Sequence, residues 1–365
     1  MEWNTIRKTA KVVVMPGDGV GPEVTYETVK VIQATDADIK FYEYSVGGEE
    51  YIEGGNPLPL KALKAVDQAD AVLLGAIGHE KTPYEIPRKV LIYLRVEKDA
   101  YANLRPLKSY KVPSNTQCKD LDVVICRDNS EGFSLQHTSK LEENMSTDRR
   151  TITNYGAKRI AKFAFEYAVS KNRRKITCVD QSNWLYSDKQ FRKAFNEVSD
   201  QYPNIARETL SVDVAAMMLA RSPEKFDVIV TPDLYGDILS GVAISHLGSV
   251  GMAPSACIGE KFAYFEPVHG TSWDITGKNE ANPIASILSG KLMLEWLGYE
   301  EEAWIIDAAV SEVISEKKIR TPDIGGSSST SELGDAIALK VLEMTDERKV
   351  YQDHLAELNE TLKIK

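Results

Sequence analysis

Short apolar runs alternate with helix-like segments along most of the chain, and this alternation limits the folds open to it. The apolar run at residues 11–15 ends in a glycine-rich turn at 16–23, and apolar residues with helical spacing follow over 24–32. Further strand-like runs, each with a helix-like segment after it, cover residues 69–75, 121–126, 175–180 and 226–230. Such connections favour parallel strands joined by right-handed crossovers. The pattern predicts an α/β fold built on a mainly parallel, twisted sheet.

Composition restricts the class of protein. The chain has 365 residues, 43% hydrophobic and 27% charged, which suits two globular domains or one large one. The net charge is −10 and the basic residues are scattered, so a nucleic-acid partner is not expected. With no signal peptide and no apolar stretch of membrane-spanning length, we expect no membrane contact and a cytoplasmic location. Cys118, Cys126, Cys178 and Cys257 lack C-x-x-C spacing and are predicted to be reduced core residues.

Two acidic residues follow the strand-like run at 226–230. Asp233, Asp237 and Gly241 fall at i, i+4 and i+8, so on a helix both carboxylates lie on one face. A bound divalent cation is one interpretation, because Mg²⁺ and Ca²⁺ prefer oxygen ligands. The other is a solvated acidic helix start, where carboxylates offset the helix dipole. The residues alone leave both open.

Three arginines in one third of the chain stand at or beside the ends of predicted elements. Arg95, Arg105 and Arg127 would suit a di- or tricarboxylate if they converged, because guanidinium groups bind carboxylates in a bidentate manner. The alternative is that they are surface arginines in ordinary ion pairs. A long irregular segment at 266–283 predicts an ordered loop, and such loops are usually functional.

Seven motifs occur in order and resemble the β-decarboxylating dehydrogenases, which include the isocitrate, 3-isopropylmalate, homoisocitrate, tartrate and D-malate enzymes. They are GDGVGPE at 17–23, YANLRP at 101–106, LYGDILS at 234–240, EPVHG at 266–270, GK at 277–278, ANP at 281–283 and TPDIGG at 321–326. The resemblance implies a large nucleotide-binding domain, 1–102 plus 258–365, and a small domain, 103–257, that carries dimer contacts. It also implies a homodimer or larger assembly with shared active sites.

The resemblance assigns roles to residues. Arg95, Arg105 and Arg127 match carboxylate binders, and Asp213 and Asp237 match ligands of Mg²⁺ or Mn²⁺, with Asp213 reaching across the dimer. The nucleotide-binding positions are His269, Gly270, Thr271, Ser272, Asp274, Ile275 and Asn282. NAD is the expected cofactor, because a carboxylate at Asp274 accepts from ribose hydroxyls and repels a 2′-phosphate. Family enzymes oxidise a 2-hydroxy acid by hydride transfer and then release carbon dioxide.

Three positions depart from the family pattern. Gln181 stands where the family has a proton-relaying lysine, and Phe133 or Ser134, depending on a small gap, stands at the tyrosine that protonates the enol. Gly241 replaces the third metal-side aspartate. Two hypotheses follow: an active NAD-dependent enzyme acting on an isocitrate-like or isopropylmalate-like acid, in which Asp233 replaces the missing carboxylate, or a catalytically silent homologue that acts as a regulatory subunit beside a complete paralogue.

The sequence does not identify the hydroxy acid. Family members differ at the segment corresponding to residues 84–94 in what they bind beyond the shared malate core. Here Arg88 and Lys89 would meet an extra carboxylate, whereas Leu91 and Ile92 would line an apolar pocket. The two cations are equally compatible with solvated helix charges.

Overall fold

The computed structural model describes residues 9–110, 120–133, 140–141 and 143–363. Ten of its strands form one sheet in the order β2-β1-β3-β12-β11-β4-β5-β10-β8-β9, and β6 and β7 form a separate pair. The strands are β1 Ala10–Gly17, β2 Ile39–Glu43, β3 Ala71–Ala76, β4 Ala102–Lys108, β5 Asp122–Asp128, β6 Lys140–Leu141, β7 Ser146–Thr147, β8 Lys175–Asp180, β9 Ala206–Ser211, β10 Val228–Thr231, β11 Pro254–Ile258 and β12 Ala263–Pro267.

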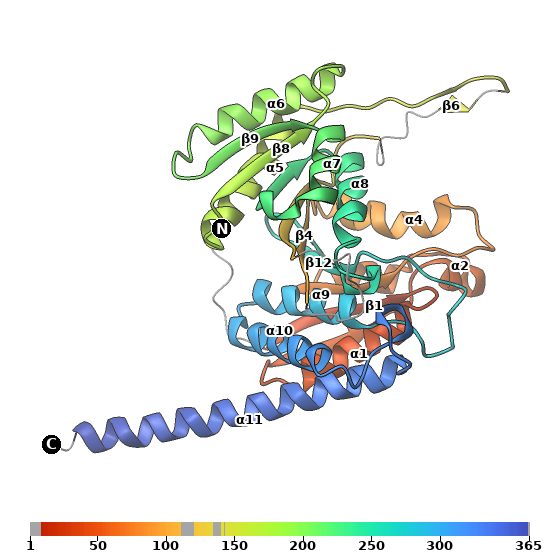
Figure 1. Ribbon diagram of the computed structural model, residues 1–365. Coiled ribbons are helices and arrows are strands. Elements are labelled where there is room, and N and C mark those ends of the chain that lie inside the picture. Colours follow the sequence, from red (N-terminus) through yellow and green to blue (C-terminus); the bar gives the residue numbers. More distant parts are fainter. Residues whose placement is uncertain (1–8, 111–119, 134–139, 142, 364–365) are drawn as a thin grey trace.

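The α-helices alternate with these strands along much of the chain (Figure 1). They are α1 Gly21–Gln33, α2 Gly48–Gly54, α3 Leu60–Val66, α4 Glu85–Ile92, α5 Asn154–Ser170, α6 Tyr186–Ser199, α7 Val212–Arg221, α8 Asp233–Ile244, α9 Ile284–Trp296, α10 Glu300–Ser315 and α11 Thr330–Lys363. Shorter helical turns are Tyr93–Glu97, Pro223–Lys225, Val250–Met252 and Pro322–Ile324. The predicted α/β class is confirmed.

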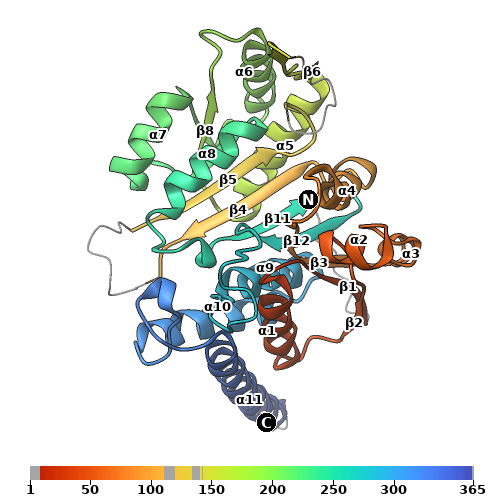
Figure 2. The same ribbon diagram turned by 90° about the vertical axis from the view of Figure 1, so that its right-hand side faces the viewer.

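Parallel pairing dominates the large sheet, as predicted. β2, β1, β3 and β12 are mutually parallel, and so are β5, β10, β8 and β9. β4 and β11 lie between these two sets and pair antiparallel with each neighbour, so the sets run in opposite directions (Figure 2). The predicted domain bounds fall at the start of β4 and the end of β11, in the middle of the sheet. The domain division stays a prediction.

Helices pack beside both halves of the sheet. α5 contacts α6 and the strands β5, β8 and β10, whereas α1, α9, α10 and α11 pack together beside β3, β11 and β12. α11 continues well past the body of the protein (Figures 1 and 2) as one helix of 34 residues. β8 has the predicted bounds, 175–180. Apolar periodicity defines α5 and α6, and the Thr153 cap fixes the start of α5.

Sequence periodicity missed β11, β12 and α2. The segment 248–259 is rich in small residues, and it contains β11, which is buried on both faces. A short strand buried in this way shows no alternation of apolar and polar residues. α2 spans seven residues between Gly47 and Gly55, and glycine is a poor helix former.

The buried interior includes Cys126, Cys178 and Cys257, which are free thiols as predicted. Burial raises the pKa of Cys126 and of Cys178 well above the ordinary thiol value, so both are protonated near neutral pH. Cys118 lies outside the described residues. Among the described residues, no helix has the combination of length and apolar character that crossing a membrane requires.

Candidate functional site

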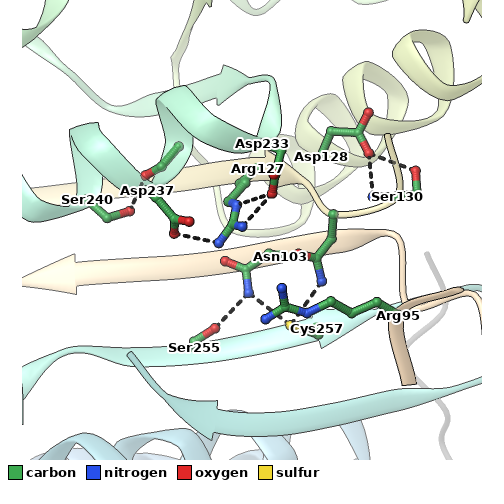
Figure 3. Close-up of polar contacts among 12 residues, drawn as sticks. Arg95, Asn103, Arg127, Asp128, Ser130, Asp233, Asp237, Ser240, Ser255 and Cys257 are labelled. Atoms are coloured by element: carbon green, nitrogen blue, oxygen red, sulfur yellow. Dashed lines mark hydrogen bonds and ion pairs between the residues drawn. The ribbon is translucent and has the colours of Figure 1, made fainter. Parts of the chain in front are cut away.

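Two aspartates on one face of α8 hold the guanidinium group of Arg127 (Figure 3). Arg127 Nε donates to Asp233 Oδ1 at 2.9 Å, and Arg127 Nη2 contacts the same oxygen. Arg127 Nη1 donates to Asp237 Oδ1 at 2.6 Å. The i, i+4 spacing therefore places both carboxylates on one face, as predicted. The group that both of them face in this fold is an arginine.

Strand pairing brings Arg127 to this helix. Arg127 lies near the end of β5 and pairs with Thr231 at the end of the parallel strand β10, immediately before α8. Gly236 lies under the aliphatic part of Arg127, because a Cβ atom there would be 2.6 Å from Arg127 Cγ. The absence of a side chain at Gly236 thus lets the arginine lie flat across the helix between the two aspartates.

Arg105 reaches the same carboxylate from the neighbouring strand. It lies on β4, and its Nη1 is 2.9 Å from Asp237 Oδ1. Burial lowers the pKa of Arg105, and the positive charge of Arg127 lowers it further, whereas Asp237 acts in the opposite direction. Arg105 and Arg127 therefore converge, as the carboxylate-binding hypothesis requires, and their charges are balanced from within the chain.

Arg95 has different partners from this pair. It belongs to the π-helical turn Tyr93–Glu97, its Nε donates to Tyr264 Oη at 2.8 Å, and its Nη2 is 3.3 Å from Glu266 Oε1. Burial acts to lower the pKa of Arg95, but Tyr264 and Glu266 outweigh it and raise that pKa. The alternative of surface ion pairs is correct in one respect, because all three arginines have carboxylate partners. It is wrong about the surface, because the three arginine side chains are only between 4% and 14% exposed.

The side-chain amide groups of Asn103 and Asn129 are buried in the same part of the sheet as Arg127. Asn103 pairs with Arg127 across β4 and β5, and its Nδ2 lies 2.9 Å from both Ser255 Oγ and Cys257 Sγ (Figure 3). Among the described residues, nothing donates to Asn103 Oδ1 or to Asn129 Oδ1, and nothing accepts from Arg105 Nε, although these atoms are buried. Such atoms are usually satisfied by water or ligand. Asn103 was not among the residues predicted from the sequence, although it lies within the YANLRP motif.

The predicted metal ligands are not brought together within one chain. Asp237 contacts Arg105 and Arg127, whereas Asp213 is exposed in the first turn of α7, where a hydrogen bond from Ser211 lowers its pKa. Gly241 is exposed, and a Cβ atom there would meet no atom within 4 Å. The described residues contain no group of three or more His, Cys, Asp or Glu side chains placed to hold a metal ion. The residues of a single described chain therefore do not fit a divalent cation.

Gln181 lies on the opposite side of α8 from Arg127. Its backbone N–H donates to Asp188 Oδ2 at 2.7 Å, and that oxygen also accepts from Tyr235 Oη at 3.0 Å. Tyr235 lies between Asp233 and Asp237 in sequence and so projects from the other face of the helix. Gln181 Oε1 is buried without a hydrogen-bond partner in the described structure. No amine stands at this position to relay a proton.

Phe133 joins the same cluster through Arg150. The guanidinium carbon of Arg150 is 5.7 Å from the centre of the Phe133 ring and 4.9 Å from that of Tyr235, and Arg150 pairs with Asp188. Phe133 is 40% exposed and provides no hydroxyl. Ser134, the other position considered for the missing tyrosine, lies outside the described residues.

The predicted nucleotide-binding segment is an ordered loop between β12 and α9. Val20 N–H donates to Thr271 O at 2.9 Å, and the approach is possible because Gly19, at φ +62°, has no side chain to collide with Thr271. Glu23 accepts from the backbone of Gly277 at 2.6 Å and of Asn279 at 3.1 Å. The turn at 16–23 therefore supports this loop.

A cleft of 110 Å³ lies along the loop. Of the predicted nucleotide-binding positions, His269, Ser272, Ile275 and Asn282 line it, and its other lining residues include Val250, Glu280 and Asp323. Burial lowers the pKa of His269, so its imidazole is neutral near pH 7. His269 Nδ1 lies 2.9 Å from Gly270 O, and Nε2 is buried without a partner among the described residues. Asp274, between Ser272 and Ile275 in sequence, is exposed.

Comparison with known proteins agrees with the motifs. Residues 11–337 match the family model described as isocitrate/isopropylmalate dehydrogenase. A 3-isopropylmalate/3-methylmalate dehydrogenase of Methanocaldococcus jannaschii is 38% identical over 91% of this chain and 99% of its own length. A mitochondrial regulatory subunit of the NAD isocitrate dehydrogenase of Dictyostelium discoideum is 37% identical over 92% of this chain and 93% of that protein.

A solved structure shares the fold. The crystal structure of isocitrate dehydrogenase from Methylococcus capsulatus matches with a TM-score of 0.86 and 34% identity, over 91% of this chain and 99% of that one. The family model, the relatives and the shared fold all cover most of the chain. The chain therefore belongs to the isocitrate/isopropylmalate dehydrogenase family.

Proposed function

We propose that the protein catalyses NAD-dependent oxidative decarboxylation of a 2-hydroxy di- or tricarboxylic acid of the isocitrate or 3-isopropylmalate type. The observation that carries this proposal is the convergence of the buried guanidinium groups of Arg105 and Arg127 beside the half-exposed carboxylate of Asp237. Guanidinium groups at such a position bind ligand carboxylates with directional, charge-assisted hydrogen bonds. Arg95, which lies next to β12 and its nucleotide loop, would hold a second carboxylate.

NAD fits the loop at 269–282. The unpartnered Nε2 of His269 and the backbone of residues 270–272 would contact the adenosine part, and Asp274 would accept from the ribose hydroxyls. When bound, NAD would accept the hydride from the hydroxyl carbon of the substrate. Because the imidazole of His269 is neutral, one of its ring nitrogens can accept a hydrogen bond from a donor group of the nucleobase.

A second copy of the chain is the expected partner. Val214 and Met217 on α7 and Leu234 and Ile238 on α8 are all exposed, between 36% and 52%, and these two helices pack on each other. Exposed apolar residues grouped in this way are typical of an interface. We propose a homodimer or larger homo-oligomer joined at α7 and α8. A cytoplasmic location also stays a prediction.

Mg²⁺ or Mn²⁺ would require ligands from more than one chain. Asp237 is the only one of the two predicted metal ligands that lies among the carboxylate-binding arginines, and Asp213 would serve the site of a second copy. Gly241 supplies no ligand. In this structure Asp237 is paired with Arg105 and Arg127 instead.

A catalytically silent, regulatory role is the second candidate function. Gln181 has an amide in place of a titrating amine, and Phe133 has no phenol, so neither side chain moves a proton at neutral pH. Similarity to the Dictyostelium regulatory subunit further supports this candidate. In that case the chain would bind NAD or a carboxylate within a hetero-oligomer with a complete paralogue.

A direct assay separates the two candidates. Purified protein is tested for NADH formation with isocitrate, 3-isopropylmalate, malate and tartrate in the presence of Mn²⁺, and NAD binding is measured by calorimetry. The enzyme proposal predicts turnover with one of these acids. NAD binding without any turnover would refute it and favour the regulatory candidate. The triple variant Gln181→Lys/Phe133→Tyr/Gly241→Asp should then gain activity if the site has lost only its acid–base groups and one metal ligand.

A further inference from the structure

The loop at 269–282 contains a tight turn that carries Asp274. Ile275 N–H donates to Ser272 O at 3.1 Å, so Trp273 and Asp274 are the two central residues of a four-residue turn. Ser272 enters this turn at φ +42°, a left-handed conformation that is unfavourable for a residue with a Cβ atom. Such a conformation persists only where the surrounding structure holds it. The turn therefore needs support from outside the loop.

Two contacts with other parts of the chain supply this support. Ile275 packs against the apolar cluster that includes Val20 and Val24 at the start of α1. Trp273 meets His79, which lies in the segment after β3, with ring centres 4.6 Å apart and ring planes at 70°. This edge-to-face geometry is one that aromatic rings prefer. Both rings are half-buried, so their contact is partly shielded from water.

His79 is itself held firmly. Lys81 N–H donates to His79 Nδ1 at 3.0 Å, which fixes the orientation of the ring. Gly48 packs directly against it, because a Cβ atom there would be 2.1 Å from His79 Cβ. The N–H groups of Gly48 and Gly78 both donate to the buried carboxylate of Asp18, at 2.9 and 2.8 Å. His79 is therefore a rigid support for the ring of Trp273.

The position of Asp274 depends on this support. Its side chain is exposed, so the backbone of the turn places its carboxylate, with little packing of its own. A carboxylate accepts from ribose hydroxyls and repels a 2′-phosphate only when it lies close to them. Without the contact between Trp273 and His79, Ser272 would relax from its left-handed conformation and Asp274 would move with the turn.

We propose that His79 and Trp273 form an aromatic clasp that positions Asp274 and thereby sets the preference for NAD over NADP. His79 is a positioning residue, because it acts through Trp273 and the turn and not by touching the nucleotide. The inference rests on the proposed binding of NAD, and it adds to that site a residue from the segment after β3, outside the nucleotide loop.

Calorimetry with NAD and with NADP tests the clasp in the wild type, His79→Ala and His79→Phe. His79→Ala should reduce the ratio of NAD affinity to NADP affinity about fivefold, as expected for the loss of one aromatic pair. His79→Phe should keep the ratio within about twofold of the wild type, because phenylalanine restores a ring facing Trp273. Both variants lose the acceptor for Lys81 N–H, so the difference between them isolates the ring contact.

A double-mutant cycle tests whether His79 acts through Asp274. Asp274→Asn should lower the ratio in the wild-type background and have a much smaller effect in His79→Ala, because the carboxylate is then already misplaced. Trp304→Ala is a matched control, since it removes a tryptophan that is 68% exposed on α10, and it should leave the ratio unchanged. Melting temperatures confirm that each variant is folded before binding is compared.

Three outcomes would overturn the inference. If the wild type binds NAD but His79→Ala leaves the ratio unchanged, or His79→Phe behaves like His79→Ala, the clasp does not set the preference, and the proposed binding of NAD survives. An equal loss of NAD and NADP affinity in His79→Ala would show a general disturbance of the loop instead of a misplaced carboxylate. If the wild type binds neither nucleotide, the proposed binding of NAD fails together with the inference.

Discussion

We predict that the stability of the folded protein depends on pH through the carboxyl group of Asp128. Asp128 directly follows Arg127 at the end of β5 and is 2% exposed. Burial raises its pKa to about 6, against the lowering effect of hydrogen bonds from Ser130 N at 2.9 Å and Ser130 Oγ at 2.8 Å. In the unfolded chain the group titrates near pH 4. The folded state therefore binds more protons between about pH 4 and pH 6, and ionising Asp128 lowers stability as the pH rises through this window.

The variant Asp128→Asn removes this cost. Both hydrogen bonds from Ser130 go to Oδ1, an acceptor that asparagine retains. A pKa difference of two units corresponds to roughly 3 kcal/mol, so the variant should be more stable by about that amount at pH 8 and equally stable near pH 4. For 365 residues, the unfolding entropy is on the order of 0.8 kcal/mol/K, so the gain in melting temperature at pH 8 is about 4 °C.

The measurement is a series of thermal melts of both proteins from pH 4 to pH 8. Asp67→Asn is a matched control of opposite sign, because a hydrogen bond from Lys98 at 2.9 Å lowers the pKa of Asp67. That lowered pKa stabilises the wild type above pH 4, and the stabilisation is lost as the pH falls. A melting-temperature difference for Asp128→Asn that does not change with pH, or a variant less stable than the wild type at pH 8, would refute the reasoning.

Three further predictions concern the same region. Gly236→Ala should destabilise the protein by about 1–3 kcal/mol, because the new methyl group would meet the side chain of Arg127. Gly241→Ala, in open space on the same helix, should stabilise the protein by roughly 0.5–1 kcal/mol. Urea unfolding of both variants checks these two values. Gly241→Asp should show a larger Mn²⁺-dependent rise in melting temperature than the wild type, since it restores a carboxylate one turn after Asp237, and an equal Mn²⁺ effect on both proteins would contradict this. NAD affinity, measured by calorimetry, should be constant from pH 7.5 to pH 8.5, because burial lowers the pKa of His269 below its ordinary value and the imidazole is neutral there, and should fall at least tenfold in His269→Ala.

Local patterns were sufficient to predict much of the fold. The bounds of α5, α6 and β8 follow from apolar periodicity and, for α5, a capping threonine, and both depend only on residues close in sequence. The same patterns could not predict β4 and β11 as the antiparallel centre of the sheet, because pairing between strands about 150 residues apart leaves no local periodicity. The positions of Gln181 and Gly241 were also informative without a structure, because loss of an amine or a carboxylate is visible in the residue type itself.

The partners of the arginines and aspartates depended on the tertiary structure. By itself, the sequence determined the family resemblance, the alternating α/β pattern and the shared helix face of Asp233 and Asp237. It left open whether these carboxylates face solvent or a cation. Only the pairing of β5 with β10 places Arg127 over Gly236 and buries it against Asp233. Arg127 and Asp233 are about 106 positions apart in the chain, so their burial and their ion pair arise only once the chain has folded.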